Sequence, residues 1–245
     1  MQQGACSRLG QVGLAGVELL MRVMALQGAR ALKTLRIVFC LFCAACVVSA
    51  HAGSQREEPL IDSVRTALSA AVNSSAPPSL VHADDKAAQA FQQWLTQAEA
   101  RLAKQLQRRK ASTTSPDALT HELASAHLRR EFLQTVWYES QRAGLEPALV
   151  LGLIQVESGF RKFAISSAGA RGFMQVMPFW TRVLAQDDAS VLFQAQTNLR
   201  FGCVILRHYL NLENGHLALA LGRYNGSRGQ MDYPNAVISA KMAWQ

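Results

Sequence analysis

Residues 147–157 read PALVLGLIQVE, and this stretch decides the fold. Pro147 suits the first turn of a helix, and the residues after it are apolar nearly all the way round. A helix that is apolar on every side is buried on every side. We therefore expect a buried helix from Ala148 to about Glu157.

The segments on both sides of this helix also have helical patterns. Residues 84–110 lack proline and glycine and carry apolar residues about every 3.5 positions, which predicts an amphipathic helix. Residues 115–117 predict a helix start, and Gly144 predicts its end. Further helices are expected over 178–184, 194–210 and 216–221, with turns and short strands over 165–176. The expected fold class is therefore mainly α, a helical domain with a small β element.

The composition and charge exclude several classes of protein. The chain has 245 residues, of which 49% are hydrophobic and 17% charged, and its formal net charge is +8. This composition supports a packed core and excludes wholesale disorder. No apolar run reaches the about 18 residues of a membrane-spanning helix, which excludes a multipass membrane protein. The short basic runs are typical of solvated helix faces, so we expect no nucleic-acid partner.

The first 52 residues are predicted to be a secretory signal peptide. Three basic residues precede an apolar run at 37–48, and an A-x-A cleavage signature follows at 50–52. Translation that begins at Met24 would make residues 1–23 a start-site artefact.

Cleavage after Ala52 would release the mature protein into the periplasm. Lipid attachment at Cys46, which would give an outer-membrane lipoprotein, is the less favoured alternative. Removing residues 1–52 takes away five basic residues and one acidic residue, and so lowers the net charge from +8 to +4. The mature chain then divides into a linker with the amphipathic helix at 53–116 and a helical domain at 117–245.

Glu157 stands out because it is the only acidic residue between Pro147 and Gln186 in the sequence. Desolvation raises the pKa of a buried carboxyl group, and the negative end of the helix dipole acts in the same direction. A carboxylic acid that stays protonated near neutral pH suits general acid catalysis. The alternative is an ordinary glutamate at a helix end, turned to solvent.

Three short motifs follow one another in this part of the chain. Residues 157–158 read ES, residues 172–175 read GFMQ, and residues 223–225 read RYN. Together they resemble the catalytic domain of the soluble lytic transglycosylases, a lysozyme-like family that cleaves peptidoglycan. Phe173 stands where the family has leucine. Arg223 stands where the family has alanine, which predicts an extra positive charge beside the cleft.

The resemblance covers roughly residues 130–240 and implies an α+β lysozyme-like fold and a peptidoglycan lytic transglycosylase. Glu157 would protonate the glycosidic oxygen between N-acetylmuramic acid and N-acetylglucosamine, then act as base toward the C6 hydroxyl of the muramoyl sugar. That hydroxyl attacks C1 and leaves a 1,6-anhydro end. One carboxylate is therefore sufficient for the reaction, and no cofactor is expected. The implied substrate-binding residues are Ser158, Met174, Gln175, Tyr224 and Asn225. Met174 also suits a core position, and Tyr224-Asn225-Gly226 an ordinary turn.

Other functions stay open from the residues alone. A lysozyme-like muramidase would need a second carboxylate, for which Asp187 and Asp188 are the candidates. A non-catalytic cell-wall-binding module is the third possibility. No metal site is expected, because His121 and His127 lie six positions apart rather than four. The expected partners are peptidoglycan glycan strands and, through the helix at 84–110, a protein of the cell envelope.

Overall fold

The computed structural model describes residues 65–66, 68–69, 84–112, 123–183 and 188–245, which all lie in one unit, Ala50–Gln245. The predicted signal peptide at 1–52 and the expected helix start at 115–117 lie outside the described residues. The helices of the described part are α3 (Asp85–Ser112), α4 (Ala126–Arg142), α5 (Pro147–Glu157), η1 (Pro178–Val183), η2 (Ala189–Phe193), α6 (Ala195–Leu212), α7 (Leu217–Asn225) and α8 (Asp232–Met242). No helix among them combines the length and the apolar character that a membrane span needs.

The mainly α fold class is confirmed, and the expected β element is smaller than predicted. Within the described residues it consists of two isolated antiparallel bridges, Ile165 to Arg171 and Arg171 to Val176. The chain reverses direction twice within this stretch, so no run of residues is long enough to pair as a strand. The segment is therefore a pair of tight turns.

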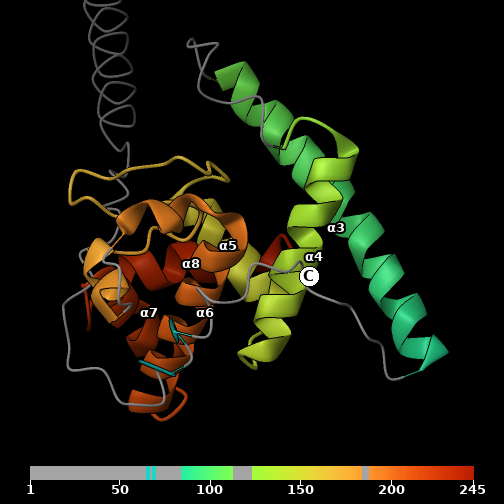
Figure 1. Cartoon of the computed structure of the whole chain (residues 1–245). Helices are drawn as coiled ribbons and strands as arrows, with labels where there is room; N and C mark the ends of the chain where they lie inside the picture. Colours follow the sequence, from blue (N-terminus) through green and yellow to red (C-terminus); the bar gives the residue numbers. More distant parts are fainter. Residues whose placement is uncertain (1–64, 67, 70–83, 113–122, 184–187) are drawn as a thin grey trace, which may run out of the picture. The chain divides into compact units, whose positions relative to one another are not determined.

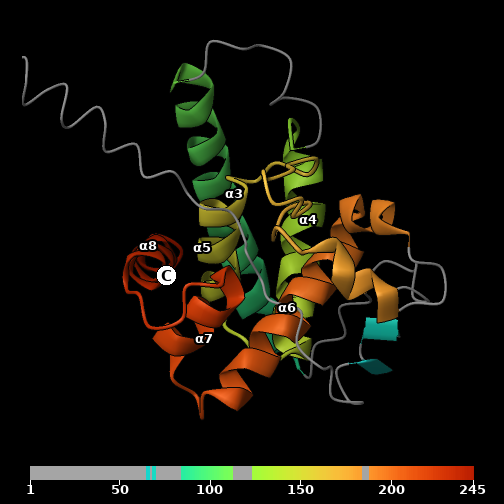
Figure 2. The ribbon, with the colours of Figure 1, turned by 90° about the vertical axis from the view of Figure 1, so that its left-hand side faces the viewer.

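The buried helix predicted at 148–157 is confirmed as α5. Leu149 to Ile154 are all buried, as is Glu157 at its last turn. α8 packs along α5, and the two ribbons lie together in both Figure 1 and Figure 2. Gly152 permits this approach, because a Cβ at this position would lie 2.6 Å from the backbone nitrogen of Lys241. The absence of a side chain on Gly152 thus lets two helix backbones touch.

The helix predicted from Asp117 begins later than expected, at Ala126. Residues 123–125 are described and are not helical. Ser125 caps the helix, since its backbone is extended and its hydroxyl oxygen accepts a hydrogen bond from the backbone nitrogen of Leu128 (3.2 Å). Gly144 follows the helix with a φ of +64°, a conformation that favours glycine. The C-terminal boundary was therefore predicted correctly and the N-terminal boundary was not.

α3 confirms the amphipathic helix predicted at 84–110, and it packs against α4 (Figure 2). Phe91 and Trp94 meet Trp137 of α4, with ring centroids 5.3 and 4.7 Å apart. Leu95 and Leu102 are buried in the same core. α3 is thus part of the core of the described unit, while the proposed boundary between residues 116 and 117 stays a prediction.

A buried ion pair ties α4 to α6. Nη2 of Arg200 lies 2.8 Å from Oε1 of Glu139, and both side chains are almost fully buried. Removal of one partner from such a pair would leave an uncompensated buried charge and cost about 3–5 kcal/mol. The pair fixes the position of α6, whose first turns hold the residues behind the GFMQ turn.

Candidate active site

Glu157 lies at the C-terminal end of α5, and its side chain is 6% exposed. Its Oε1 accepts a hydrogen bond from the hydroxyl of Tyr233. Its Oε2 is buried and has no hydrogen-bond partner among the described residues. Desolvation raises the pKa of Glu157 to about 8, while the hydrogen bond from Tyr233 acts in the opposite direction. The burial of Glu157 therefore favours the protonated carboxyl group near neutral pH.

The antiparallel packing of α5 and α8 brings Tyr233 to Glu157. Gly152, one and a half turns before Glu157, contacts Lys241 near the end of α8. From there α5 runs toward Glu157 while α8 runs back toward its first turn, where Tyr233 lies. The hydroxyl of Tyr233 is consequently buried against the carboxyl group, which raises the pKa of Tyr233 well above its ordinary value, mainly through desolvation. Tyr233 is thus a neutral hydrogen-bond donor.

A sharp turn follows Glu157 and opens the site. Gly159 and Phe160 both have positive φ angles, +55° and +66°. Phe160 is not a glycine, and its ring is held by edge contacts with Phe132 and Trp244. The turn carries the chain away from the axis of α5, so that the carboxyl group faces a cleft rather than the next residue of the chain.

The cleft at Glu157 has a volume of about 410 Å³, within the range of small-molecule binding sites. Its lining includes Arg109, Glu157, Ser158, Arg161, Ser166 and Gln175. Among the described residues, Glu157 is the one acidic residue that lines it. The cleft therefore joins the end of α5 to the turns at 164–175 and to the end of α3.

Gln175 lies in the cleft wall, as predicted, but its amide nitrogen is occupied. Nε2 donates to the backbone oxygens of Ala164 (3.1 Å) and Gly172 (2.9 Å), and the residue has a φ of +49°. Gly172 cannot carry a side chain, because a Cβ would lie 2.3 Å from Nδ2 of Asn198. Gln175 therefore holds the turn that forms this wall of the cleft.

Asn198 explains why the GFMQ turn keeps its shape. Its Oδ1 accepts from the backbone nitrogen of Met174 (2.8 Å), and its Nδ2 donates to the backbone oxygens of Arg171 and Leu192 (both 2.9 Å). Asn198 itself is buried and lies in the first turn of α6. Asn198 thus anchors the turn to α6.

Ser158 also lines the cleft, next to Glu157. Its hydroxyl donates to the backbone oxygen of Ile154 (3.2 Å), one turn back along α5. This hydrogen bond belongs to the end of the helix, and the structure shows none from Ser158 to Glu157. Ser158 therefore lies in the cleft lining, and its role in substrate binding stays a prediction.

Three predicted substrate-binding residues lie behind the cleft rather than in its lining. Met174 is fully buried and packs against Gly202, where its sulfur fills the space of a missing side chain. The hydroxyl of Tyr224 donates to the backbone oxygen of Met174 (2.7 Å), so the phenol stabilises the turn that contains Met174. Asn225 is buried at the last residue of α7. These positions match the core interpretation of Met174, and they make the motif residues the support of the cleft.

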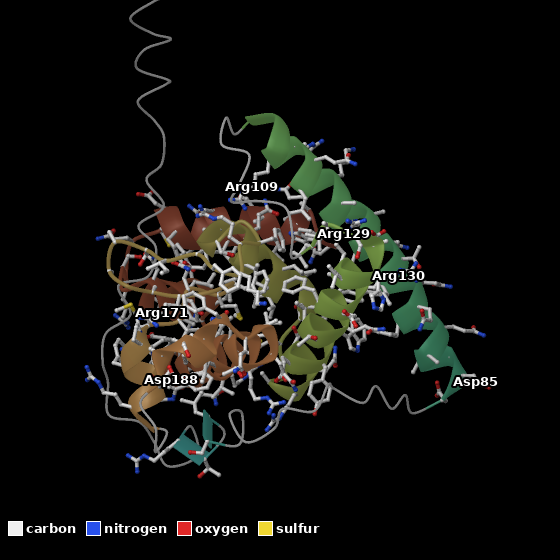
Figure 3. All side chains as sticks on the ribbon, turned by 45° about the horizontal axis from the view of Figure 1, so that its top comes forward. Asp85, Arg109, Arg129, Arg130, Arg171 and Asp188 are labelled. Atoms are coloured by element: carbon white, nitrogen blue, oxygen red, sulfur yellow. The ribbon has the colours of Figure 1, made fainter. Side chains whose placement is uncertain are left out.

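Two charged residues singled out from the sequence, Arg223 and Asp188, are not among the residues that line the cleft. Nε of Arg223 binds Glu213, which also binds Arg228 (2.6 Å), so the extra positive charge predicted at Arg223 belongs to a cluster of two arginines and one glutamate. The hydrogen bonds from Arg228 and Arg223 lower the pKa of Glu213 to about 2. Asp188 is the N-cap of η2 and binds Ser190, and Figure 3 places it far from Arg109, a residue of the cleft lining.

Other predictions stay untested. Asp187 and His121 lie outside the described residues. His127 is an exposed residue that faces Glu131 at 3.4 Å. The expectation that this chain holds no metal therefore stays a prediction, as does an envelope protein as partner of α3.

Two residues of the site were missed from the sequence. Tyr233 lies on α8, for which no helix was predicted, although Pro234 in the first turn was a usable signal. Arg109 comes from α3, far from the motifs along the chain, and nothing in its local sequence marks it. Both residues reach the site through packing of distant helices.

Comparison with known proteins identifies the same region. Residues 134–241 match the family model of the transglycosylase SLT domain. The membrane-bound lytic murein transglycosylase C of Actinobacillus pleuropneumoniae serotype 5b (strain L20) is 47% identical over 95 residues, which cover 38% of this chain and 24% of that protein. The protein of the same name from Haemophilus influenzae (strain PittEE) is 45% identical over 49 residues, covering 20% of this chain and 14% of that protein. The match thus spans about a quarter or less of the length of these relatives.

Among solved structures, the X-ray structure of an inactive mutant of the lytic transglycosylase Slt from Pseudomonas aeruginosa is 18% identical. The similarity has a TM-score of 0.39 and covers 78% of this chain and 36% of that chain. The resemblance predicted from the ES, GFMQ and RYN motifs is confirmed by the family model, since residues 134–241 of this chain match the transglycosylase SLT domain.

Proposed function

We propose that this chain is a peptidoglycan lytic transglycosylase that cleaves the β-1,4 bond between N-acetylmuramic acid and N-acetylglucosamine. The observation that carries the proposal is the position of Glu157, a buried residue that lines the cleft; its burial raises the pKa of the carboxyl group to about 8 and so favours the protonated form near neutral pH. The match of residues 134–241 to the SLT domain supports the same reaction.

Glu157 acts first as the acid. The proton of its carboxyl group passes to the glycosidic oxygen as the bond from that oxygen to C1 of the muramoyl sugar breaks. Oε2, which is buried and has no hydrogen-bond partner among the described residues, is the oxygen left to carry this proton, because Oε1 accepts from Tyr233. The hydrogen bond from Tyr233 to Oε1 favours the ionised carboxyl group, so Tyr233 stabilises the carboxylate that forms in this step.

Glu157 then acts as the base. The C6 hydroxyl of the muramoyl sugar attacks C1, and its proton returns to the carboxylate, which leaves a 1,6-anhydro end and regenerates the acid. No water enters the products, so no second carboxylate is required. This fits a cleft in which Glu157 is the one acidic lining residue among those described.

The experiment compares products released from cell-wall sacculi. We expect mass spectrometry to find muropeptides with 1,6-anhydro ends after digestion by the mature protein, and none after digestion by Glu157→Gln. Glu131→Gln is the matched control, because it makes the same chemical change on an exposed residue of α4. Products with reducing ends would instead indicate a muramidase, and sacculus binding without any turnover would indicate a wall-binding module.

We also propose that the protein acts in the cell envelope after export. The signal-peptide pattern of residues 1–52 supports this, as do the names of the matched relatives, which describe membrane-bound enzymes. N-terminal sequencing of the protein from fractionated cells tests the proposal. A periplasmic protein that begins at Gly53 is expected. An unprocessed chain found in the cytoplasm would contradict export, and a lipid-modified N-terminus at Cys46 would support the outer-membrane lipoprotein instead.

A further inference from the structure

The cleft at Glu157 is smaller than the proposed substrate. Its volume of about 410 Å³ suits one small molecule, whereas a glycan strand is a polymer of many sugars. Sugars on either side of the reacting bond must therefore leave the cleft and cross its rim. The side chains at the rim are the ones that can bind this outer part of the strand.

Two large apolar side chains are exposed at one rim of the cleft. Phe163 is 62% exposed and Ile165 is 64% exposed, while Ala164 between them is buried. Ala164 and Ile165 both line the cleft, so Phe163 and Ile165 extend its wall toward solvent. Single exposed apolar residues are common on protein surfaces, but an apolar surface that continues a cleft is typical of a binding site.

The ring of Phe163 is held by its neighbours. It packs against Phe193 of η2, with ring centroids 5.6 Å apart and an interplanar angle of 54°. Nζ of Lys162 lies 5.0 Å from the ring centroid of Phe163, and Cζ of Arg171 lies 5.6 Å from that of Phe193. These cation–π contacts stabilise the positions of both rings. The apolar surface is therefore preorganised, which lowers the entropy cost of binding a ligand on it.

This surface lies away from the end of α3. Arg171, which contacts Phe193, is well separated in Figure 3 from Arg109, which lines the cleft at the end of α3. The two phenylalanine rings therefore continue the cleft on the side away from α3.

We propose that Phe163 and Ile165 form a rim site that binds a sugar of the glycan strand next to the sugars held in the cleft. This inference rests on the proposed function, because it follows the same strand beyond the cleft. A pyranose ring has a face made mainly of C–H groups, so it can pack on an apolar side chain while its hydroxyl groups stay in water. Phe163 offers the larger apolar area, and Ile165 joins this area to the cleft.

The test compares two peptide-free glycan strands that differ in length, one of four sugars and one of eight. Removal of the stem peptides leaves only sugars to contact the rim site. For the mature wild-type protein we expect kcat/KM per cleavable bond to be higher on the long strand. In Phe163→Ala the ratio of long to short strand should fall by about tenfold, mostly through KM, which is the effect expected of one aromatic side chain that packs on a ligand.

Further variants assign the ratio to the rim site. Phe163→Tyr keeps the ring and should keep the wild-type ratio, whereas Ile165→Ala should lower it in the same direction as Phe163→Ala. Met242→Ala is the matched control, because Met242 is also 64% exposed but lies at the end of α8 and is not among the residues that line the cleft. Binding of both strands to Glu157→Gln, with and without Phe163→Ala, measures the same loss without turnover.

The outcomes separate the rim site from the proposed function. Equal kcat/KM on both strands in the wild type, or a ratio unchanged in Phe163→Ala or lowered equally in Met242→Ala, would overturn the rim site and leave the transglycosylase proposal intact. A dimer in sedimentation that Phe163→Ala dissociates would also overturn it, since the surface would then bind a second copy of the chain. A wild-type protein that cleaves neither strands nor sacculi would contradict the proposed function, and binding to Glu157→Gln would still decide the rim site.

Discussion

Replacing Glu157 with glutamine is expected to stabilise the protein, and the gain should grow as the pH rises. Glutamine keeps the shape of the side chain and still accepts the hydrogen bond from Tyr233, but it cannot ionise. In the wild type the carboxyl group has a pKa of about 8 in the folded state, against an ordinary value of 4.5. The substitution therefore isolates the cost of a buried charge.

The magnitude follows from proton linkage. Below pH 4.5 the carboxyl group is protonated in both the folded and the unfolded chain, so the substitution has little effect on the free energy of unfolding. Between pH 4.5 and 8 the unfolded chain loses the proton and the folded chain keeps it, so the wild type loses stability. At about 1.36 kcal/mol per pKa unit, the loss is about 2 kcal/mol at pH 6 and approaches about 5 kcal/mol above pH 8.

Urea unfolding of both proteins at about pH 4, 6 and 8.5 measures this difference. We expect nearly equal stability at the lowest pH and a clear advantage of Glu157→Gln at the highest. Glu131→Gln should show no such trend, because Glu131 is exposed. A difference that stays constant across this range, or a variant that is less stable than the wild type at pH 8.5, would refute the raised pKa of Glu157.

Three further substitutions test the surroundings of the site. Tyr233→Phe removes the hydrogen bond that lowers the pKa of Glu157, so turnover should fall and the alkaline limb of the pH–rate profile should move to higher pH. Gly152→Ala places a Cβ 2.6 Å from the backbone of α8, and thermal unfolding should reveal a loss of about 1–3 kcal/mol together with lower activity. Asn198→Ala removes three hydrogen bonds, two of them buried and one part-buried, and urea unfolding should show a loss of about 3 kcal/mol.

The buried helix and its terminal acid could be predicted because both depend on local sequence. The stretch 147–157 is apolar on all sides, so its burial follows from composition alone, and Glu157 is the exception within it. The start of α4 was predicted poorly because the local signal for a helix start occurs at more than one position. Ser125 caps the helix through a short-range hydrogen bond, and several serines in this part of the chain offer equally good local signals.

The motifs could not predict whether each side chain points into the cleft or into the core. Residues 172–175 and 224–225 occur together in the sequence whether they touch substrate or support the turn that does. Met174 is buried because Gly202 leaves space for it on α6, and Tyr224 is buried because its hydroxyl meets the Met174 carbonyl. Both contacts depend on how distant helices pack, and the spacing of the motifs carries no information about this packing.

The two missed residues depend on tertiary structure to an even greater extent. Tyr233 lies 76 positions from Glu157 along the chain, and α8 brings it to the carboxyl group only because Gly152 allows close helix packing. Arg109 lies 49 positions before Ser158 and reaches it from the end of α3, a helix that comes before α4 and α5 in the chain. Their contacts with the site are products of the fold rather than of any local pattern.

The protonation state of Glu157 can be measured directly. A carbon-13 NMR titration of the side-chain carboxyl group, assigned by its absence from Glu157→Gln, follows this one acid from pH 4 to 10. A midpoint near 8 is expected from its burial. A midpoint near the ordinary value of 4.5 would mean that the group is ionised at neutral pH and could not donate the proton that cleavage requires.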